Sequence, residues 1–492
     1  MFVRILMIAC GPVMFVSSVA LGQDIDATKA DHARAQAAIQ GAVEEAASDP
    51  TRPVYHFRPP AQWMNDICGA IYHKGYYHIF YQLNPYGDGW GADGSAWGHA
   101  RSRDLVKWEH LPIALLPRTR SGVRRCNSGC VTRDAGGRVM IFYTVVPKKG
   151  KRSQWAAVAE DDELRSWRRV AGPLMSVGAA GVPKNTNGGW SDPFVFKSDG
   201  RTFVTFKSCG GLVCQATDKA LTKWKYVGRM DGVSGECPNF FKLGDKWVLL
   251  RSTYPPSYRI GQFHADKIAF TAEAGKGGTV DYVYGPKRPG PWSRGFYGTN
   301  VLFDDKGRCV LLAWVSGFKP KRGWNGCMSL PRIITLDKNA RLIQKPAPEL
   351  KNLRGEAVAV KKMTVSDASK FISGAGGDTI EIVAELQAGD AKAFGLKLRS
   401  SDDGKNALVI RQDAAKLNVA GTDVPVALGK TLKLHIFLDR SVMEVFVNDG
   451  THTVTRVVYP GEKDLKVAIF AEGGAAAIEA MTVWQMKRIW AR

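Results

Sequence analysis

One hairpin pattern recurs five times between residues 69 and 315 of this 492-residue chain. Each copy contains an apolar strand, a tight turn of glycine with lysine or aspartate, and a second apolar strand, as is typical of β-hairpins. The copies span residues 69–82, 130–145, 193–208, 238–253 and 300–315. Leu-x-x-Trp motifs at Leu105, Leu164 and Leu221 repeat alongside them. Strand repeats with a period in the fifties to sixties indicate a β-propeller, and five hairpins predict five blades.

Acidic residues recur at the entry to these hairpins. The residues eight or nine positions before the turn glycines are Asp66, Ser128, Asp192, Glu236 and Thr299. The innermost strand of each propeller blade lines the central channel, so equivalent positions converge on one axis. We therefore predict that Asp66, Asp192 and Glu236 share one register and meet at one end of the channel.

Three carboxyl groups that lie close together cannot all ionise normally, so one is driven toward its protonated form. Glycoside hydrolysis uses two carboxyl groups in different protonation states: an ionised nucleophile and a carboxylic acid that protonates the leaving oxygen. The alternative is that the acids are turn and cap residues of a binding propeller, because aspartate is common in turns. Their shared position favours the hydrolytic interpretation.

The remainder of the chain predicts four further segments and an all-β fold. Residues 1–22 have one arginine, an apolar core and a small-residue exit, which is typical of the signal peptide of a secreted or periplasmic protein. Residues 23–52 are rich in alanine and charge and favour a loose helix. The propeller would occupy residues 53–340, with a proline-containing linker over 341–355. Residues 356–492 alternate apolar and polar side chains in short runs, which predicts a C-terminal β-sandwich.

Charge and cysteine content argue against several other functions. The net charge is +22, but lysine and arginine are scattered and form no basic helix or tail, so we expect no nucleic-acid partner. No later run is long enough to insert into a membrane. Cys209 and Cys214 could form a hairpin disulfide, and Cys126 and Cys130 are a second close pair. Neither pair has the partners of a zinc site, so we expect no metal and no cofactor.

Several ordered motifs resemble those of glycoside hydrolase family 32, which contains invertases, levanases and inulinases. They are WMND at 63–66, WGHA at 97–100, DLVKWEHLP at 104–112, Glu236 with Cys237, and MSLPR at 328–332. Residues 434–450 resemble the family's β-sandwich, and the likeness extends from about Tyr55 to the C-terminus. The family has a five-bladed propeller followed by a sandwich, in agreement with the hairpin count.

The resemblance implies a retaining double displacement on β-D-fructofuranosides in sucrose or fructans. Asp66 would be the nucleophile, Glu236 the acid and then the base, and Asp192 the residue that stabilises the transition state. Further residues match positions that bind or surround the terminal sugar: Trp63, Asn65, Gln82, Trp90, Asn127, Ser128, Ser191 and Cys237. For Trp90 and Trp97 the alternative is packing within a blade.

The chain departs from the family pattern around the sugar site. Ser191 precedes Asp192 where the family has arginine, and Asn127 replaces an aromatic residue. Ile67 and Cys68 replace proline and asparagine after the nucleophile, and residues 295–298 lack an acid. We expect the chemistry to be retained and the substrate to have shifted. Three interpretations remain: a fructan- or sucrose-cleaving hydrolase, another furanosidase, and a carbohydrate-binding protein with little turnover.

Overall fold

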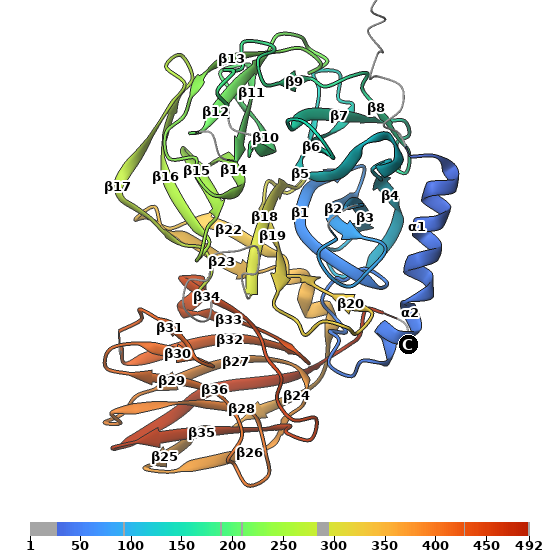
Figure 1. Cartoon of the computed structure of the whole chain (residues 1–492). Coiled ribbons are helices and arrows are strands. Elements are labelled where there is room, and N and C mark those ends of the chain that lie inside the picture. The colour runs from blue at the N-terminus through green and yellow to red at the C-terminus, as the bar shows by residue number, and fades with distance from the viewer. Residues whose placement is uncertain are drawn as a thin grey trace, which may run out of the picture.

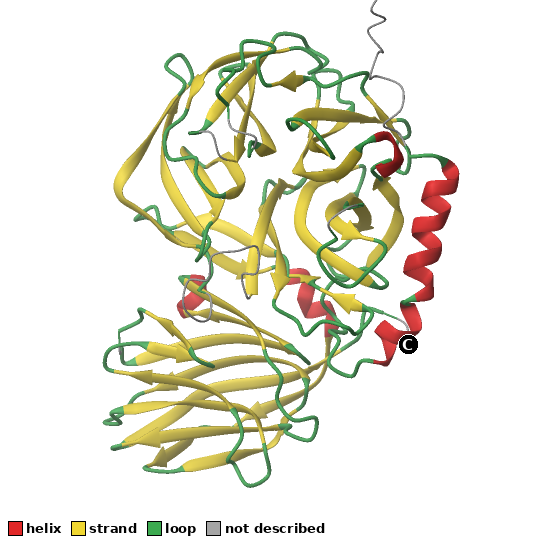
Figure 2. Cartoon of the chain, viewed as in Figure 1, coloured by secondary structure: helices red, strands yellow, loops and turns green. Residues whose placement is uncertain are grey.

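The computed structural model describes residues 27–91, 94–186, 189–207, 210–282, 295–427 and 429–490. Nearly all of the regular structure is β (Figure 2). Two helices, α1 (Lys29–Gly41) and α2 (Val43–Ser48), precede the first strand, and three short 3-10 helices are η1 (Thr119–Ser121), η2 (Pro348–Leu353) and η3 (Asn448–Gly450). The predicted signal peptide over residues 1–22 lies outside the described residues.

The described residues between 62 and 346 form five sheets that follow one another along the chain, apart from the late strand β20 (Figure 1). Their strands pair antiparallel, except that β20 pairs in parallel with β1. The first contains β1 (Gln62–His73), β2 (Tyr76–Asn84), β3 (Ala96–Ser102), β4 (Trp108–Leu115) and β20 (Trp324–Asn325). The second contains β5 (Val123–Arg133), β6 (Val139–Pro147), β7 (Ser153–Ala159), β8 (Trp167–Arg169) and β9 (Met175–Ser176). The third contains β10 (Ser191–Ser198), β11 (Arg201–Lys207), β12 (Leu212–Ala216) and β13 (Trp224–Arg229). The fourth contains β14 (Glu236–Leu243), β15 (Lys246–Ser252), β16 (Ser257–His264) and β17 (Ala269–Thr279). The fifth contains β18 (Gly295–Phe303), β19 (Cys309–Ser316), β21 (Cys327–Met328), β22 (Arg332–Leu336) and β23 (Leu342–Pro346).

The first strands of these sheets contact one another in a closed ring. β1 contacts β5, β5 contacts β10, β10 contacts β14, β14 contacts β18, and β18 contacts β1. β20 strengthens the closure, because this late strand pairs in parallel with the start of β1. The N-terminal part is therefore a propeller, and residues far apart in sequence meet around its axis.

The C-terminal part is a sandwich of two sheets, as its alternating pattern predicted. One sheet contains β24 (Arg354–Val360), β25 (Met363–Ser366), β27 (Thr379–Gln387), β32 (Thr431–Asp439), β33 (Val442–Val447), β34 (His452–Val457) and β36 (Ala475–Met486). The other contains β26 (Ser369–Gly376), β28 (Ala393–Ser400), β29 (Leu408–Asp413), β30 (Leu417–Val419), β31 (Thr422–Val424) and β35 (Lys466–Glu472). Their inward-facing aliphatic side chains form a separate core.

The linker predicted over residues 341–355 is different in the structure. Its first part is β23, which pairs with β22 as the outermost strand of the fifth sheet and buries Leu342 and Gln344. The prolines at 346 and 348 end this strand, because proline cannot donate to a ladder, and η2 follows. The propeller therefore continues past the predicted boundary.

The predicted helix in residues 23–52 is present as α1 and α2. Ala35 and Ile39 of α1 join the core of the first sheet, so the helix lies against the outside of that sheet (Figure 1). Asp31 caps the N-terminus of α1 and also pairs with Arg120 at 2.8 Å. None of the helices in the described parts of the chain is both long and apolar enough to span a bilayer.

A buried polar network joins the propeller to the sandwich. Arg332 of β22 is fully buried and pairs with Asp281 at 2.9 Å and with Glu444 of β33 at 2.6 Å. His56 lies between Glu444, at 3.2 Å, and Asp439, at 2.8 Å. Burial opposes a charge on His56, but the hydrogen bonds to the two carboxyl groups raise its pKa to about 9. The two parts are thus connected by paired charges as well as by apolar contacts.

Candidate active site

The ladder of each sheet's first strand is interrupted at a corresponding place. The pairing jumps between Met64 and Ile67, Asn127 and Gly129, Ser191 and Phe194, Glu236 and Asn239, and Tyr297 and Asn300. Such bulges bend a strand and re-aim its side chains, often next to active sites. At Asp192, Cys237 and Gly298 the backbone takes positive φ values of 53°, 43° and 57°. Four of the hairpin-entry positions, Asp66, Ser128, Asp192 and Thr299, therefore lie within bulges, and Glu236 lies directly before one.

The prediction of one shared register for the three acids is wrong. Counted from the last paired residue before each bulge, Glu236 is that residue, Asp192 is the first residue after it, and Asp66 is the second. Glu236 is the last paired residue before its bulge, so its equivalent in the third sheet is Ser191, and Cys237 corresponds to Asp192. The count failed because Gly200 is the second residue of its two-residue turn, whereas Gly244 is the first residue of the next turn. The shift does not separate the acids, because they still face one cavity.

A cavity of about 200 Å³ contains all three acids. Its lining residues are Asn65, Asp66, Gln82, Trp90, Arg125, Asn127, Ser128, Arg152, Asp192, Lys207, Glu236, Tyr297 and Trp314. These residues come from all five sheets or from the connections between their strands. The structure thus brings together carboxyl groups that are 170 residues apart along the chain.

Asp66 is half-buried and accepts two side-chain hydrogen bonds on one oxygen. Ser128 Oγ donates to its Oδ2 at 2.7 Å, and Cys237 Sγ lies 3.3 Å from the same atom. Burial, followed by the charges of Asp192 and Glu236, raises the pKa of Asp66 to about 7. The two donors act in the opposite direction and favour the ionised carboxylate. Asp66 therefore titrates near neutral pH.

Asp192 is buried, and the backbone N–H of Cys237 donates to its Oδ2 at 3.2 Å. Burial raises the pKa of Asp192, the positive charge of Lys207 lowers it, and Glu236 raises it again. Cys237 therefore contacts two of the acids, Asp192 through its backbone and Asp66 through its thiol. Burial, followed by the three carboxylates, raises the pKa of that thiol well above its ordinary value, so it serves as a neutral donor.

Glu236 is more open than the other two acids, with 39% of its side chain exposed. Lys207 Nζ forms an ion pair with its Oε1. The Tyr297 hydroxyl lies 3.1 Å from Oε2 and 2.9 Å from the carbonyl oxygen of Ser252, and it can donate its one proton to either. The most accessible carboxyl group of the cavity is thus held from both sides.

Trp63 is buried and does not line the cavity, although the family resemblance implied a position around the sugar. It packs edge-on against Trp90, with ring centroids 5.3 Å apart, and against Trp314 at 6.1 Å. Both of those rings line the cavity, so Trp63 supports the wall from behind. Trp90 is 37% exposed, which favours the sugar-binding interpretation over packing. Trp97 is buried and donates to the carbonyl oxygen of Asn127 at 3.1 Å, which favours packing.

The polar residues predicted near the sugar have mixed positions. Asn65 and Gln82 line the cavity, and Gln82 is fixed by donating to the carbonyl oxygen of Cys126 at 2.8 Å. Ser191 is fully buried, and its Oγ lies 3.5 Å from a guanidinium nitrogen of Arg152. Ser191 is therefore not among the lining residues, but its side chain hydrogen-bonds to Asp192 and lowers the pKa of that carboxyl group.

Sequence reasoning missed five lining residues: Arg125, Arg152, Lys207, Tyr297 and Trp314. Lys207 and Trp314 lie on the second strands of their sheets, which a count along the first strands cannot reach. Tyr297 is the equivalent of Glu236 in the fifth sheet, because both are the last paired residues before a bulge. Aligning the hairpins by their bulges would have found it.

The cysteines are thiols where the structure describes them. Cys68, Cys130, Cys214, Cys237, Cys309 and Cys327 are free and buried. Cys209 lies outside the described residues, and with it the predicted hairpin disulfide. No group of three or more His, Cys, Asp or Glu side chains within the described ranges is arranged to hold a metal ion.

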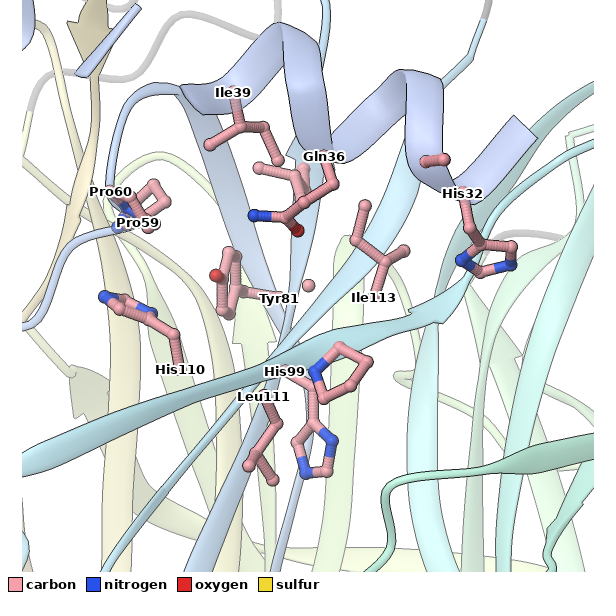
Figure 3. Close-up of a pocket in the computed structure, with 14 residues that line it drawn as sticks. His32, Gln36, Ile39, Pro59, Pro60, Tyr81, His99, His110, Leu111 and Ile113 are labelled. Carbon is pink, nitrogen blue, oxygen red and sulfur yellow. The ribbon is translucent and has the colours of Figure 1, made fainter. Parts of the chain in front are cut away.

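A second cavity, of about 490 Å³, lies between α1 and the first sheet (Figure 3). His32, Gln36 and Ile39 extend from α1 toward Tyr81 and strands β3 and β4. It has no carboxyl group in its lining. The cavity lacks the acid pair that glycoside hydrolysis requires.

Known proteins resemble the chain over most of its length. The sequence is 30% identical to a levanase of Bacillus subtilis, over 89% of this chain and 71% of the levanase. It is 29% identical to a sucrose-6-phosphate hydrolase of Zymomonas mobilis, over 88% of this chain and 92% of that enzyme. It is 28% identical to a fructan 6-exohydrolase of Beta vulgaris, over 89% of this chain and 87% of that enzyme.

Solved structures share the fold. Fructan 1-exohydrolase IIa from Cichorium intybus superimposes with a TM-score of 0.77 at 24% identity, covering 89% of this chain and 98% of that one. The profile of the glycosyl hydrolases family 32 N-terminal domain matches residues 56–346, and that of the family's C-terminal domain matches residues 349–485. These matches make the chain a glycosidase that hydrolyses O-glycosyl bonds. With its propeller, its sandwich and an acid-lined cavity on the propeller axis, this chain belongs to glycoside hydrolase family 32.

Proposed function

We propose that the chain hydrolyses β-D-fructofuranosidic bonds in sucrose or fructans with retention of configuration. The observation that carries the proposal is the convergence of Asp66, Asp192 and Glu236 on one cavity. Relatives named as levanase, sucrose-6-phosphate hydrolase and fructan exohydrolase support fructose-containing oligo- or polysaccharides as the substrate class. We further propose that the five sheets are five blades and that the chain is exported.

In the first step Asp66 attacks the anomeric carbon while Glu236 protonates the departing oxygen. The bond from Asp66 to carbon forms as the glycosidic bond breaks, leaving a fructosyl ester. Burial suits Asp66 to this role because it is poorly solvated, and Ser128 orients it from one side. Glu236 is the most exposed of the three acids, which suits it to protonate the leaving group.

In the second step Glu236, now ionised, takes a proton from water, and the hydroxide equivalent displaces Asp66. Asp192 holds the sugar hydroxyls and balances the positive charge that develops on the ring. With a pKa of about 7, Asp66 is protonated for part of the time at neutral pH, whereas attack requires it to be ionised. Because interacting carboxyl groups titrate as a set, substrate binding can redistribute that proton within the cluster.

The test is product analysis with purified protein on sucrose, inulin, levan and arabinan. We expect fructose from at least one of the first three, and its loss in Asp66→Ala and Glu236→Gln. Release of arabinose in place of fructose would refute the fructoside assignment. Turnover unchanged in both variants would place catalysis elsewhere.

A second candidate is another furanosidase, acting on arabinose-containing or modified fructose-containing sugars. It is favoured by the changed surroundings of the middle acid, where a buried serine at 191 contacts Arg152. The arabinan arm of the same assay separates the two candidates.

A further inference from the structure

Lys207 occupies a position from which its charge reaches two of the three acids. It is the last residue of β11, and its Cα is paired across the ladder with that of Ser191. Opposed residues of an antiparallel pair have Cβ atoms about 4.5–5.5 Å apart on one face of the sheet. A side chain from either position therefore reaches the same place beside Asp192. From there Lys207 Nζ contacts Glu236 of the next sheet.

The surroundings of Lys207 keep it charged. Burial opposes its charge, but Asp192 and Glu236 outweigh burial and raise the pKa of Lys207 above its ordinary range. The other titratable groups around the acids are Asp66 and Cys68 from β1, Cys237 from β14 and Tyr297 from β18. Two further cations, Arg125 and Arg152, also line the cavity. On the far side of Ser191, Arg152 donates to the carbonyl oxygen of Gly189 at 3.1 Å.

The cavity needs such a cation because three carboxyl groups face one small space. Like charges at this separation drive one another toward protonation, and an opposite charge within about 4–6 Å reverses that effect. The residue before Asp192, where the family pattern has arginine, is an uncharged serine in this chain. Position 207 is the cross-strand partner of that residue. A positive charge is therefore present beside Asp192, but it comes from Lys207 on the opposite strand.

We propose that Lys207 is the positioning residue of the acid cluster, and that its ammonium group supplies from β11 the positive charge that position 191 lacks. The proposal rests on the proposed function of the same cavity. Lys207 holds Glu236 in orientation through their ion pair and keeps Asp192 ionised while the sugar is bound.

The first test is the pH profile of kcat/KM for Lys207→Met and Lys207→Arg. We expect Lys207→Met to lower kcat/KM by about 10- to 100-fold, as loss of a charged hydrogen bond does. Both limbs of its profile should move to higher pH by about one unit, because the carboxyl groups lose an opposite charge. Lys207→Arg keeps the charge, so its limbs should stay in place.

Lys246→Met is the matched control. Lys246 lies on β15, is exposed to a similar extent and pairs with Glu273 at 2.7 Å, away from the cavity. We expect it to keep the wild-type kcat/KM and pH profile. A rescue variant, Ser191→Arg with Lys207→Ser, moves the cation to the opposite strand. We expect it to recover at least tenfold over Lys207→Ser alone and to return the limbs to their wild-type pH.

A readout that needs no turnover separates this proposal from the proposed function. Protein labelled with ¹³C at aspartate carboxyl carbons is titrated by NMR, and Asp192→Asn assigns the resonance. We expect the Asp192 midpoint to rise in Lys207→Met, because the charge of Lys207 lowers the pKa of Asp192, and to return in the rescue variant. An unmoved midpoint in a folded Lys207→Met overturns the proposal, whatever the substrate. If the titration midpoint moves but the wild type cleaves no fructoside, only the proposed function is refuted.

Discussion

Replacing Arg332 with methionine tests whether paired charges hold the propeller to the sandwich. The guanidinium of Arg332 is completely buried between Asp281 and Glu444, which are themselves buried. It also donates to Gln344 at 3.0 Å and stacks on Phe296 with its carbon 4.2 Å from the ring centroid. Methionine fills much of the same space but leaves two carboxyl groups without their partner.

The expected cost is about 3–5 kcal/mol, the range for removing one member of a buried ion pair. Unfolding entropy is about 2.1 cal/mol/K per residue, so a 492-residue chain that unfolds as one unit changes by about 1 kcal/mol per kelvin. Arg332→Met should therefore lower Tm by about 3–5 °C. If the sandwich unfolds separately, the shift of its own transition should be larger.

The matched control is Arg341→Met. Arg341 pairs with Asp337 at 2.8 Å, but its side chain is 59% exposed. Exposed pairs contribute about 0–1 kcal/mol, so we expect a Tm change below about 1 °C. The assay is scanning calorimetry at pH 7 and pH 5. Burial raises the pKa of Asp281, and Arg332 is the cation that opposes this, so the deficit of Arg332→Met should shrink at pH 5 as Asp281 takes up a proton. Equal melting of the two variants would refute the reasoning.

Three further predictions concern pH and close packing. Because the pKa of His56 is raised to about 9, the stabilisation from protonated His56 is complete below about pH 6.5 and is lost as pH rises toward 9. Wild-type Tm should therefore fall between pH 6.5 and 9, and His56→Gln should flatten the fall. A parallel fall in both proteins would contradict this. Ser128→Ala removes a hydrogen bond from ionised Asp66, so kcat/KM should drop about 10- to 100-fold. The acidic limb of the pH profile should move up from about pH 7. An unmoved limb would show that Asp66 does not set the acidic limb. Gly298→Ala places a Cβ against Oδ1 of Asp66 and 2.8 Å from the Cα of Asp66. We expect kcat to fall by at least 100-fold while circular dichroism shows a correctly folded protein. Gly307→Ala, in an open turn, is the control.

The sequence predicted the elements of the fold because its hairpins are local. Each turn and its two apolar strands lie within about 15 residues, so their pattern is legible without knowing what they pack against. The sandwich could be predicted for the same reason, because its alternating strands are also local in sequence. The end of the propeller was misjudged, because only pairing with β22 shows that residues 342–346 belong to the fifth sheet.

The site was predicted less completely. Asp66, Asp192 and Glu236 were found from their spacing, but their exact register depended on which turn residue was glycine. Lys207 could not be found along the first strands, since its role follows from pairing with Ser191 across a ladder. Residues that act across strands emerge only when the register is known.

The most direct test of the account is to trap the fructosyl ester on Asp66. In Glu236→Gln, a fructoside with a good leaving group needs no acid for the first step, whereas the second step lacks its base. We predict that mass spectrometry of the digested protein will find one fructosyl group, on the peptide that contains Asp66. A label on another residue, or none while the leaving group is released in a burst, would contradict the claim that the ring of strands builds a retaining active site from these acids.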